Sequence, residues 1–136
     1  MDRQKAALYA WEETFRCFNE HILTREETCK VIRRCCKQYS VGQPIVYFLS
    51  RDKLEWSSCH GTEIYLNYYH CNYASACHEA AHYILRLLDH EDDTEYHGPE
   101  FVCLYLDLLV REKVAPRSAL EASLEQAGIE WTKPAR

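Results

Sequence analysis

The stretch Cys77–Phe101, CHEAAHYILRLLDHEDDTEYHGPEF, contains the side chains that say most about the fold and function of this chain of 136 residues. If residues 74–88 form a helix, His78 and His82 lie four residues apart on one face, where two imidazoles can bind one metal ion. Glu79 follows the first histidine and is placed beside the same ion as a base. The spacing therefore predicts a zinc site with His78 and His82 as ligands and Glu79 as the catalytic residue.

A third ligand has to come from elsewhere, because a catalytic zinc usually takes three protein ligands and keeps a fourth position for water. His97 is the first candidate, since residues 89–96 can span up to about 26 Å when extended and can easily return to the helix. Glu95 and Glu100 are alternatives, because carboxylates also serve as third ligands to a histidine pair. His90 is a further alternative, although it leaves less chain in which to turn back.

The residues that surround this motif on the helix form a frame of uncharged side chains, which suits a buried active-site helix. A structural interpretation is a helix with two satisfied core histidines and a surface glutamate. That interpretation leaves Glu79 without a partner on a largely apolar segment, which is unfavourable. The frame consists of Ser75, Ala76, Ala80, Ala81, Tyr83 and Ile84.

The motifs HExxH at 78–82 and HGPEF at 97–101 resemble the zincin superfamily, and the H-G-x-x-F ending is similar to SprT-like (Spartan-like) metallopeptidases. Together with HGPEF, the opening segment Asp2–Glu12 resembles an uncharacterised metallohydrolase family of actinobacteria and their phages. The resemblance implies a zinc metallopeptidase that acts on a peptide or protein substrate. It also implies that the strand at 62–68 forms the cleft edge along which an extended peptide pairs. The chain lacks the C-x-x-C pair and the appended recognition domain of larger SprT-like proteins, which argues against DNA-bound protein substrates.

Composition predicts one domain over residues 1–136, because 47% hydrophobic content in this length suits one core and not two. The resemblance implies that this domain is zincin-like. The net charge of −5 argues against a general nucleic-acid-binding surface. No apolar run approaches the roughly 18 residues of a membrane span, and the N-terminus lacks the apolar core of a secretion signal. We therefore expect a cytoplasmic protein without a membrane partner.

Periodicity predicts two N-terminal helices. Residues 3–22 form the first, on the strength of one apolar stripe made by Leu8, Trp11, Phe15, Phe18 and Ile22. The second begins with a capping box of Thr24 and Glu27 and runs to about Gln38. Its basic stripe could contact nucleic acid or an acidic partner, or form a solvated face offset by nearby glutamates. That stripe comprises Lys30, Arg33, Arg34 and Lys37.

The middle of the chain predicts a short, mostly antiparallel sheet, so the fold class is α+β. Residues 45–49 suit a buried strand, residues 54–58 a weak second strand, and residues 62–67 a half-buried strand. Asn72 can cap the metal-binding helix. Two C-terminal helices follow, one from Gly98-Pro99 to about Glu112 and one over 117–127, closed by Gly128.

Eight cysteines, at 17, 29, 35, 36, 59, 71, 77 and 103, are expected to be mostly free thiols that pack as small hydrophobes. A second, structural zinc is an alternative, built from some of Cys35, Cys36, Cys59, His60, His70 and Cys71. Their spacing lacks the short C-x-x-C pairs that mark such a site. Disulfides remain a third interpretation.

The predicted mechanism is hydrolysis of a peptide or amide bond. A zinc ion lowers the pKa of its bound water to about 7, and Glu79 can take that water's proton and pass it to the leaving amine. Four tyrosines could stabilise the oxyanion, and spacing selects none of them: Tyr65, Tyr69, Tyr96 and Tyr105.

Two other classes of function stay open. One is a nucleic-acid-associated protein that uses the basic stripe, with a structural metal. The other is an interaction or inhibitor module, such as a phage or host regulatory factor, in which zinc holds the fold. Glu79 favours the enzyme, because a structural site has no need of a base between its ligands.

Overall fold

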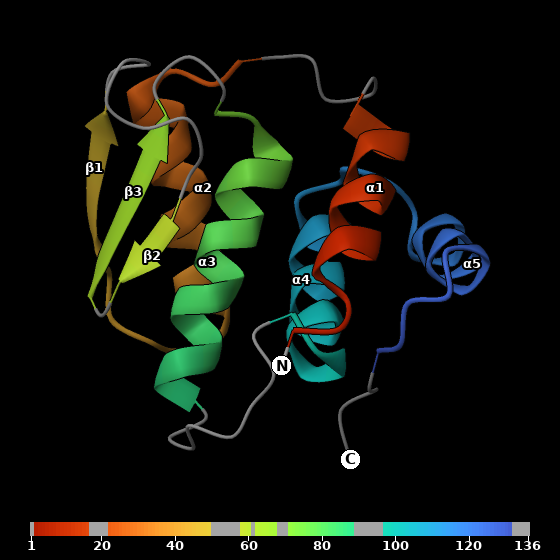
Figure 1. The fold of residues 1–136 in the computed structure, drawn as a ribbon. Helices are drawn as coiled ribbons and strands as arrows, with labels where there is room; N and C mark the ends of the chain where they lie inside the picture. The colour runs from red at the N-terminus through yellow and green to blue at the C-terminus, as the bar shows by residue number, and fades with distance from the viewer. Residues whose placement is uncertain are drawn as a thin grey trace.

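The computed structural model describes residues 2–16, 22–49, 58–60, 62–67, 71–88 and 97–131, with the backbone alone at 15–16, 58–60 and 67. The described part is α+β, in agreement with the predicted class (Figure 1). Along the described part of the chain, two helices come first, three short strands follow, and three helices come last. The elements in order are α1 Lys5–Arg16, α2 Arg25–Gln38, β1 Ile45–Leu49, β2 Ser58–His60, β3 Glu63–Asn67, α3 Tyr73–Leu88, α4 Pro99–Arg111 and α5 Arg117–Gln126.

The sheet has the strand order β1-β3-β2 and combines one parallel with one shorter antiparallel pairing, so the prediction of a mostly antiparallel sheet is wrong. β1 and β3 are parallel, from the pair Ile45 and Glu63 to the pair Leu49 and Asn67. β2 runs antiparallel to β3 over a shorter register. Each strand runs opposite to the one before it in the chain, so β1 and β3 point the same way. Because β3 lies between β1 and β2, it pairs with β1 in parallel and with β2 in antiparallel orientation.

The position of β3 also overturns the expectation that it forms a free cleft edge. Both of its sides are paired, because β1 and β2 flank it. β1 lies at an edge of the described sheet and is not buried as predicted, since Ile45 is 54% and Tyr47 40% exposed. The buried side of the sheet is formed by Ile64 and Leu66 of β3, which alternate with outward-facing residues.

α3 is the central element of the fold. It contacts α2, α4, β2 and β3, and it lies between the sheet and the helices α1 and α4 (Figure 1). Its residues from Ala76 to Ile84 are buried. An element covered on all these sides places its polar side chains in the interior, and the histidine motif lies in that stretch.

The predicted helix over residues 3–22 differs from the structure at both ends. α1 is described from Lys5 to Arg16, residues 17–21 lie outside the described part, and Ile22 is not helical and 47% exposed. Ile22 lies just before the start of α2, where the N-cap Thr24 is extended and the amide of Leu23 donates to the carbonyl of Cys71. Leu8 and Trp11 are buried as the apolar stripe predicts.

The predicted caps at the starts of α2, α3 and α4 and at the end of α5 are confirmed. Thr24 and Glu27 form both hydrogen bonds of the capping box, and the amide of Ser75 donates to Asn72 Oδ1 over 2.8 Å. Gly98 is the N-cap of α4 with proline at its first position. Gly128 follows α5 with φ +71°, a left-handed conformation that glycine adopts at low cost.

Among the described residues, no helix has the length and apolar character needed to cross a membrane.

Candidate metal centre

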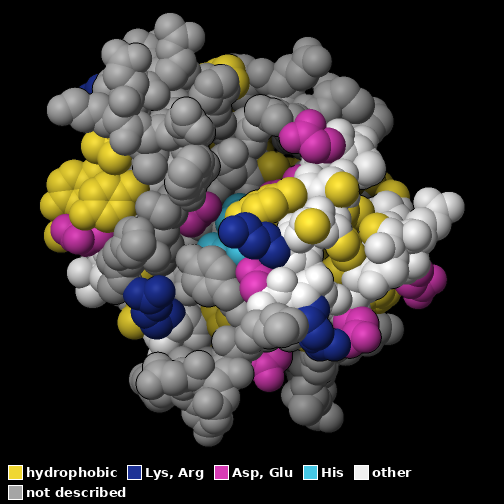
Figure 2. Space-filling model, in the orientation of Figure 1, with side chains coloured by type: hydrophobic (Ala, Val, Ile, Leu, Met, Phe, Trp, Pro, Cys, Tyr) yellow, Lys and Arg dark blue, Asp and Glu magenta, His cyan; other side chains and the backbone are white. Residues whose placement is uncertain are grey.

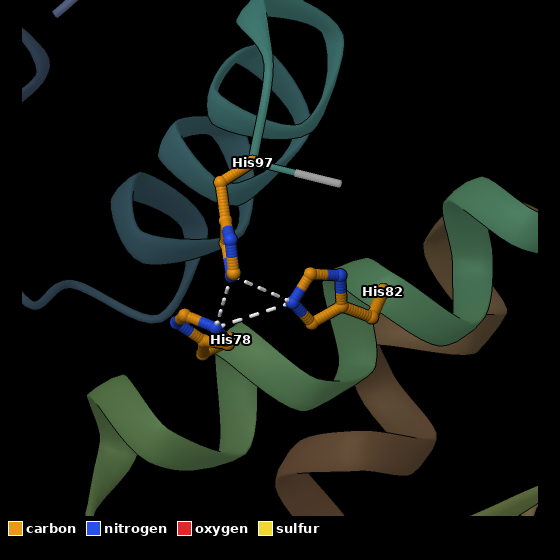
Figure 3. Close-up of side chains that lie close together, drawn as sticks. All are labelled: His78, His82 and His97. Carbon is orange, nitrogen blue, oxygen red and sulfur yellow. Dashed lines mark hydrogen bonds between the residues drawn. The ribbon is translucent and has the colours of Figure 1, made fainter. Parts of the chain in front are cut away.

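Three histidines meet between α3 and the start of α4. His78 and His82 project from α3, and His97 projects from the residue before the N-cap of α4 (Figure 3). The distances between their Nε2 atoms are 3.2 Å for His78–His82, 3.1 Å for His82–His97 and 3.3 Å for His78–His97. All three side chains are buried, and together they could hold a metal ion.

The local sequence explains how these rings converge. The helical spacing of four residues puts His78 and His82 on one face. The carbonyl of His97 accepts a hydrogen bond from Gln4 Nε2 at 3.0 Å, which fixes the backbone of the third histidine. Phe101, one turn into α4, is buried, and its ring stacks on His82 with centroids 4.2 Å apart. The HGPEF motif therefore provides both a ligand and the apolar wall behind it.

The other candidates for the third ligand are not in this cluster. Glu100 is exposed on the first turn of α4. Glu95 and His90 lie outside the described residues, as does the acidic run that contains them. Among the described residues, the structure brings His97 to the histidine pair.

Glu79 lies in the interior, only 6% exposed, and its Oε1 atom has no hydrogen-bond partner in the described part of the chain. Burial raises the pKa of its carboxyl group to about 7; His78 opposes this rise and the charge of Glu12 adds to it. A carboxyl group with a pKa near neutrality can both accept and release a proton at physiological pH.

Two carboxylates from the N-terminal segment contact the outer nitrogens of the histidines. His78 Nδ1 donates to Glu12 Oε2 at 3.0 Å, and His97 Nδ1 donates to Asp2 Oδ2 at 2.6 Å. Neither carboxylate was predicted as part of the site from the sequence. A signal existed for Glu12, which lies four residues after the buried Leu8 and so on the edge of the apolar stripe of α1. Asp2 precedes the helix and carries no such signal.

The histidines differ in their affinity for protons. Burial lowers the pKa of His82, and so do the neighbouring His78 and His97. Burial also lowers the pKa of His97, only partly opposed by Asp2. For His78, burial is outweighed by the hydrogen bond to Glu12 and by its charge, so that pKa is raised. At neutral pH, His82 and His97 are therefore neutral and have a lone pair available for a metal ion.

The described tyrosines proposed as oxyanion donors are already engaged. Tyr65 donates to Glu63 at 3.0 Å on the sheet, and Tyr105 donates to Glu12 Oε2 at 2.6 Å. Tyr69 and Tyr96 lie outside the described residues. Tyr9, which the sequence did not indicate, is 44% exposed, and its ring lies against His78 and His97 with centroids 5.9 and 5.6 Å apart.

Six cysteines are described, and all six are free thiols: Cys29, Cys35, Cys36, Cys71, Cys77 and Cys103. In the described part of the chain the one group with metal-binding geometry is the histidine cluster. Cys71 Sγ lies 3.2 Å from the hydroxyl of Thr28. The side chains of Cys17, Cys59, His60 and His70, and with them part of the predicted second zinc site, lie outside the described residues.

The basic stripe on α2 is partly neutralised by ion pairs. Arg34 makes two hydrogen bonds to the carboxylate of Glu112, at 2.6 and 3.1 Å. Lys30 lies 3.3 Å from Glu26. Two of the four basic side chains of the stripe are therefore paired with acidic ones.

Histidine side chains are visible near the centre of one face of the molecule, recessed among hydrophobic, acidic and basic side chains (Figure 2). Comparison of the chain with protein-family models, with curated proteins and with solved structures gave no match. The resemblance to zincins therefore stays a prediction.

Proposed function

We propose that this protein is a zinc-dependent hydrolase, a metallopeptidase of zincin type that cleaves peptide or other amide bonds. The observation that carries the proposal is the meeting of three buried Nε2 atoms, 3.1 to 3.3 Å apart, beside the buried carboxyl group of Glu79. His78, His82 and His97 would hold the ion, and Glu79 would act as the base.

The residues present fit a zinc ion. Two nitrogens that share a tetrahedral zinc at roughly 2.0–2.1 Å lie about 3.3 Å apart, close to the distances in this cluster. His78 and His97 donate hydrogen bonds from Nδ1 to carboxylates, so whenever these two rings are neutral their Nε2 lone pairs face each other. A cation between them replaces this repulsion with attraction. Three imidazoles also suit other transition metals, and zinc is favoured by the HExxH pattern.

Glu79 has the properties of a proton carrier in this reaction. A zinc ion held there would act as a Lewis acid and would lower the pKa of a water molecule to about 7. The Oε1 atom of Glu79 would accept a proton from the attacking water and deliver it to the nitrogen of the leaving amine. Its burial without a partner among the described residues leaves that oxygen available for both transfers.

A peptide substrate would meet a different strand from the one implied by the resemblance. β3 is paired on both sides, whereas β2 is an edge of the described sheet and contacts α3. An extended peptide that adds to this sheet would therefore pair with the backbone of β2. Such pairing recognises main chain with little demand on sequence.

The experiment compares zinc-loaded wild type, Glu79→Gln and the control Glu100→Gln on a quenched-fluorescence peptide library. Glu79→Gln keeps the shape of the side chain and loses the proton acceptor, so we expect its rate to fall by about 10² to 10⁴ while zinc stays bound. Glu100 is exposed and outside the cluster, so its variant should match wild type. Equal rates for Glu79→Gln and wild type would contradict the proposal.

One observation favours a second function, a zinc-stabilised binding module: all three histidines are buried, as in a structural site. The same experiment separates the two. A protein that binds zinc and cleaves no member of the library, with or without Glu79, would be assigned to the binding module.

A further inference from the structure

The N-terminal segment forms the outer wall of the metal centre, although it is distant in sequence. Asp2 lies 95 residues before His97, and Glu12 lies 66 residues before His78. Each carboxylate accepts a hydrogen bond from the histidine nitrogen that faces away from the cluster. Both lie too far from the cluster in sequence for a local turn or helix contact to bring them there, so the fold itself brings them together.

These hydrogen bonds determine which nitrogen of each ring can bind a metal. An ionised carboxylate only accepts hydrogen bonds, so Nδ1 of His78 and Nδ1 of His97 carry the hydrogen. The lone pair of each neutral ring then lies on Nε2, which points into the cluster (Figure 3). Without the carboxylates the rings could rotate or change tautomer, and the three lone pairs would not converge.

Further contacts hold the two carboxylates in place. Glu12 Oε2 also accepts a hydrogen bond from Tyr105, whose hydroxyl is buried and lies 3.3 Å from the carbonyl of Ala74. Gln4 joins the N-terminal segment to His97 on one side and to the backbone of Glu130 on the other. The N-terminal segment that carries both carboxylates is therefore held against the rest of the protein by several hydrogen bonds.

We propose that Asp2 and Glu12 are positioning residues of the metal centre, which orient His97 and His78 and thereby set the affinity for metal. The inference rests on the proposed metal site. Partners that hold the outer nitrogen of a ligand histidine typically change metal affinity by about 10- to 100-fold. Docking of the N-terminal segment is thus a condition for tight metal binding.

The test is zinc affinity, measured by competition with a chromophoric chelator, for wild type, Asp2→Ala, Glu12→Ala and the control Glu13→Ala. Glu13 is the next residue on α1 and is exposed, so its loss removes the same charge from the same helix. We expect about 10- to 100-fold weaker binding in the first two variants and wild-type affinity in the control. Asp2→Asn and Glu12→Gln should recover part of the loss, because the amide oxygen can still accept the hydrogen bond.

A second measurement separates positioning from general loss of structure. Cobalt replaces zinc in histidine sites, and its visible absorption reports the ligand geometry. We expect altered bands in Glu12→Gln and Asp2→Asn, which keep the shape of the side chains, and an unchanged spectrum in Glu13→Ala. If an alanine variant does not fold, these two amide variants decide the question.

The possible outcomes are distinct. Zinc affinity and cobalt spectra of all Asp2 and Glu12 variants that equal those of Glu13→Ala would overturn this inference and leave the metal site intact. Absence of zinc binding by the wild-type protein would instead overturn the proposed metal site, and the positioning role with it.

Discussion

Glu12 Oε2 lies 3.0 Å from His78 Nδ1 and 2.6 Å from the hydroxyl of Tyr105, so one carboxylate oxygen joins α1, α3 and α4. Burial raises the pKa of Tyr105, and the charge of Glu12 raises it further. The phenol therefore stays protonated and keeps its donor role at physiological pH. This oxygen links a helix of the N-terminal segment to the histidine cluster.

Tyr105→Phe removes that donor and leaves the ring in place. We expect zinc affinity to fall, by less than in Glu12→Ala, because the carboxylate keeps its bond to His78 and loses one restraint. Chelator competition measures the change. A Tyr105→Phe protein with weaker zinc binding than Glu12→Ala would show that the hydroxyl acts in another way.

Phe101 packs against all three histidine rings, with centroids 4.2 to 5.2 Å away. Phe101→Ala should lower the free energy of unfolding by about 3–5 kcal/mol and also weaken zinc binding, because a cavity opens behind the ligands. Leu109→Ala is the matched control, since Leu109 is buried on the same helix about 12 Å further along. It should lose stability in urea denaturation and keep zinc affinity; a parallel loss of affinity in both variants would contradict a specific role for Phe101.

Trp11 Nε1 donates to Ser123 Oγ at 2.7 Å and joins α1 to α5. Ser123→Ala should reduce the free energy of unfolding by about 1 kcal/mol, because the indole donor loses its partner. A double-mutant cycle with Trp11→Phe isolates the hydrogen bond. Simple additivity of the two substitutions would show that the bond contributes nothing to stability.

Burial raises the pKa of the Cys71 thiol to about 11, opposed by its contact with Thr28. The unfolded thiol ionises at lower pH, so between about pH 9 and 11 the unfolded state holds fewer protons than the folded state, and stability falls as pH rises. By pH 10 this group accounts for a loss of roughly 1 kcal/mol. Urea denaturation at pH 7.5 and 10 measures it. Cys71→Ala should lose less stability between the two values than wild type, and an equal loss would refute the assignment.

The sequence was sufficient for features that depend on local spacing. Helical spacing placed His78 and His82 together, and the length of residues 89–96 made the return of His97 possible. The capping residues Thr24 and Asn72 were recognisable because each cap depends on three or four consecutive residues.

Features that depend on packing between distant segments were not predictable in the same way. The insertion of β3 between β1 and β2 depends on strand pairing, which periodicity does not encode. The role of Asp2 depends on a contact across 95 residues with a histidine. Glu12 could have been found, because its position four residues after Leu8 puts a carboxylate at the border of a buried stripe.

The most direct test of the metal centre is the zinc content of purified wild-type protein and of His97→Ala, after dialysis against metal-free buffer. We expect one zinc ion per wild-type chain and loss of that ion in the variant, because His97 is the proposed ligand that joins the start of α4 to the histidine pair on α3. A His97→Ala protein that retains its full zinc content would contradict the proposed site and show that another residue completes it.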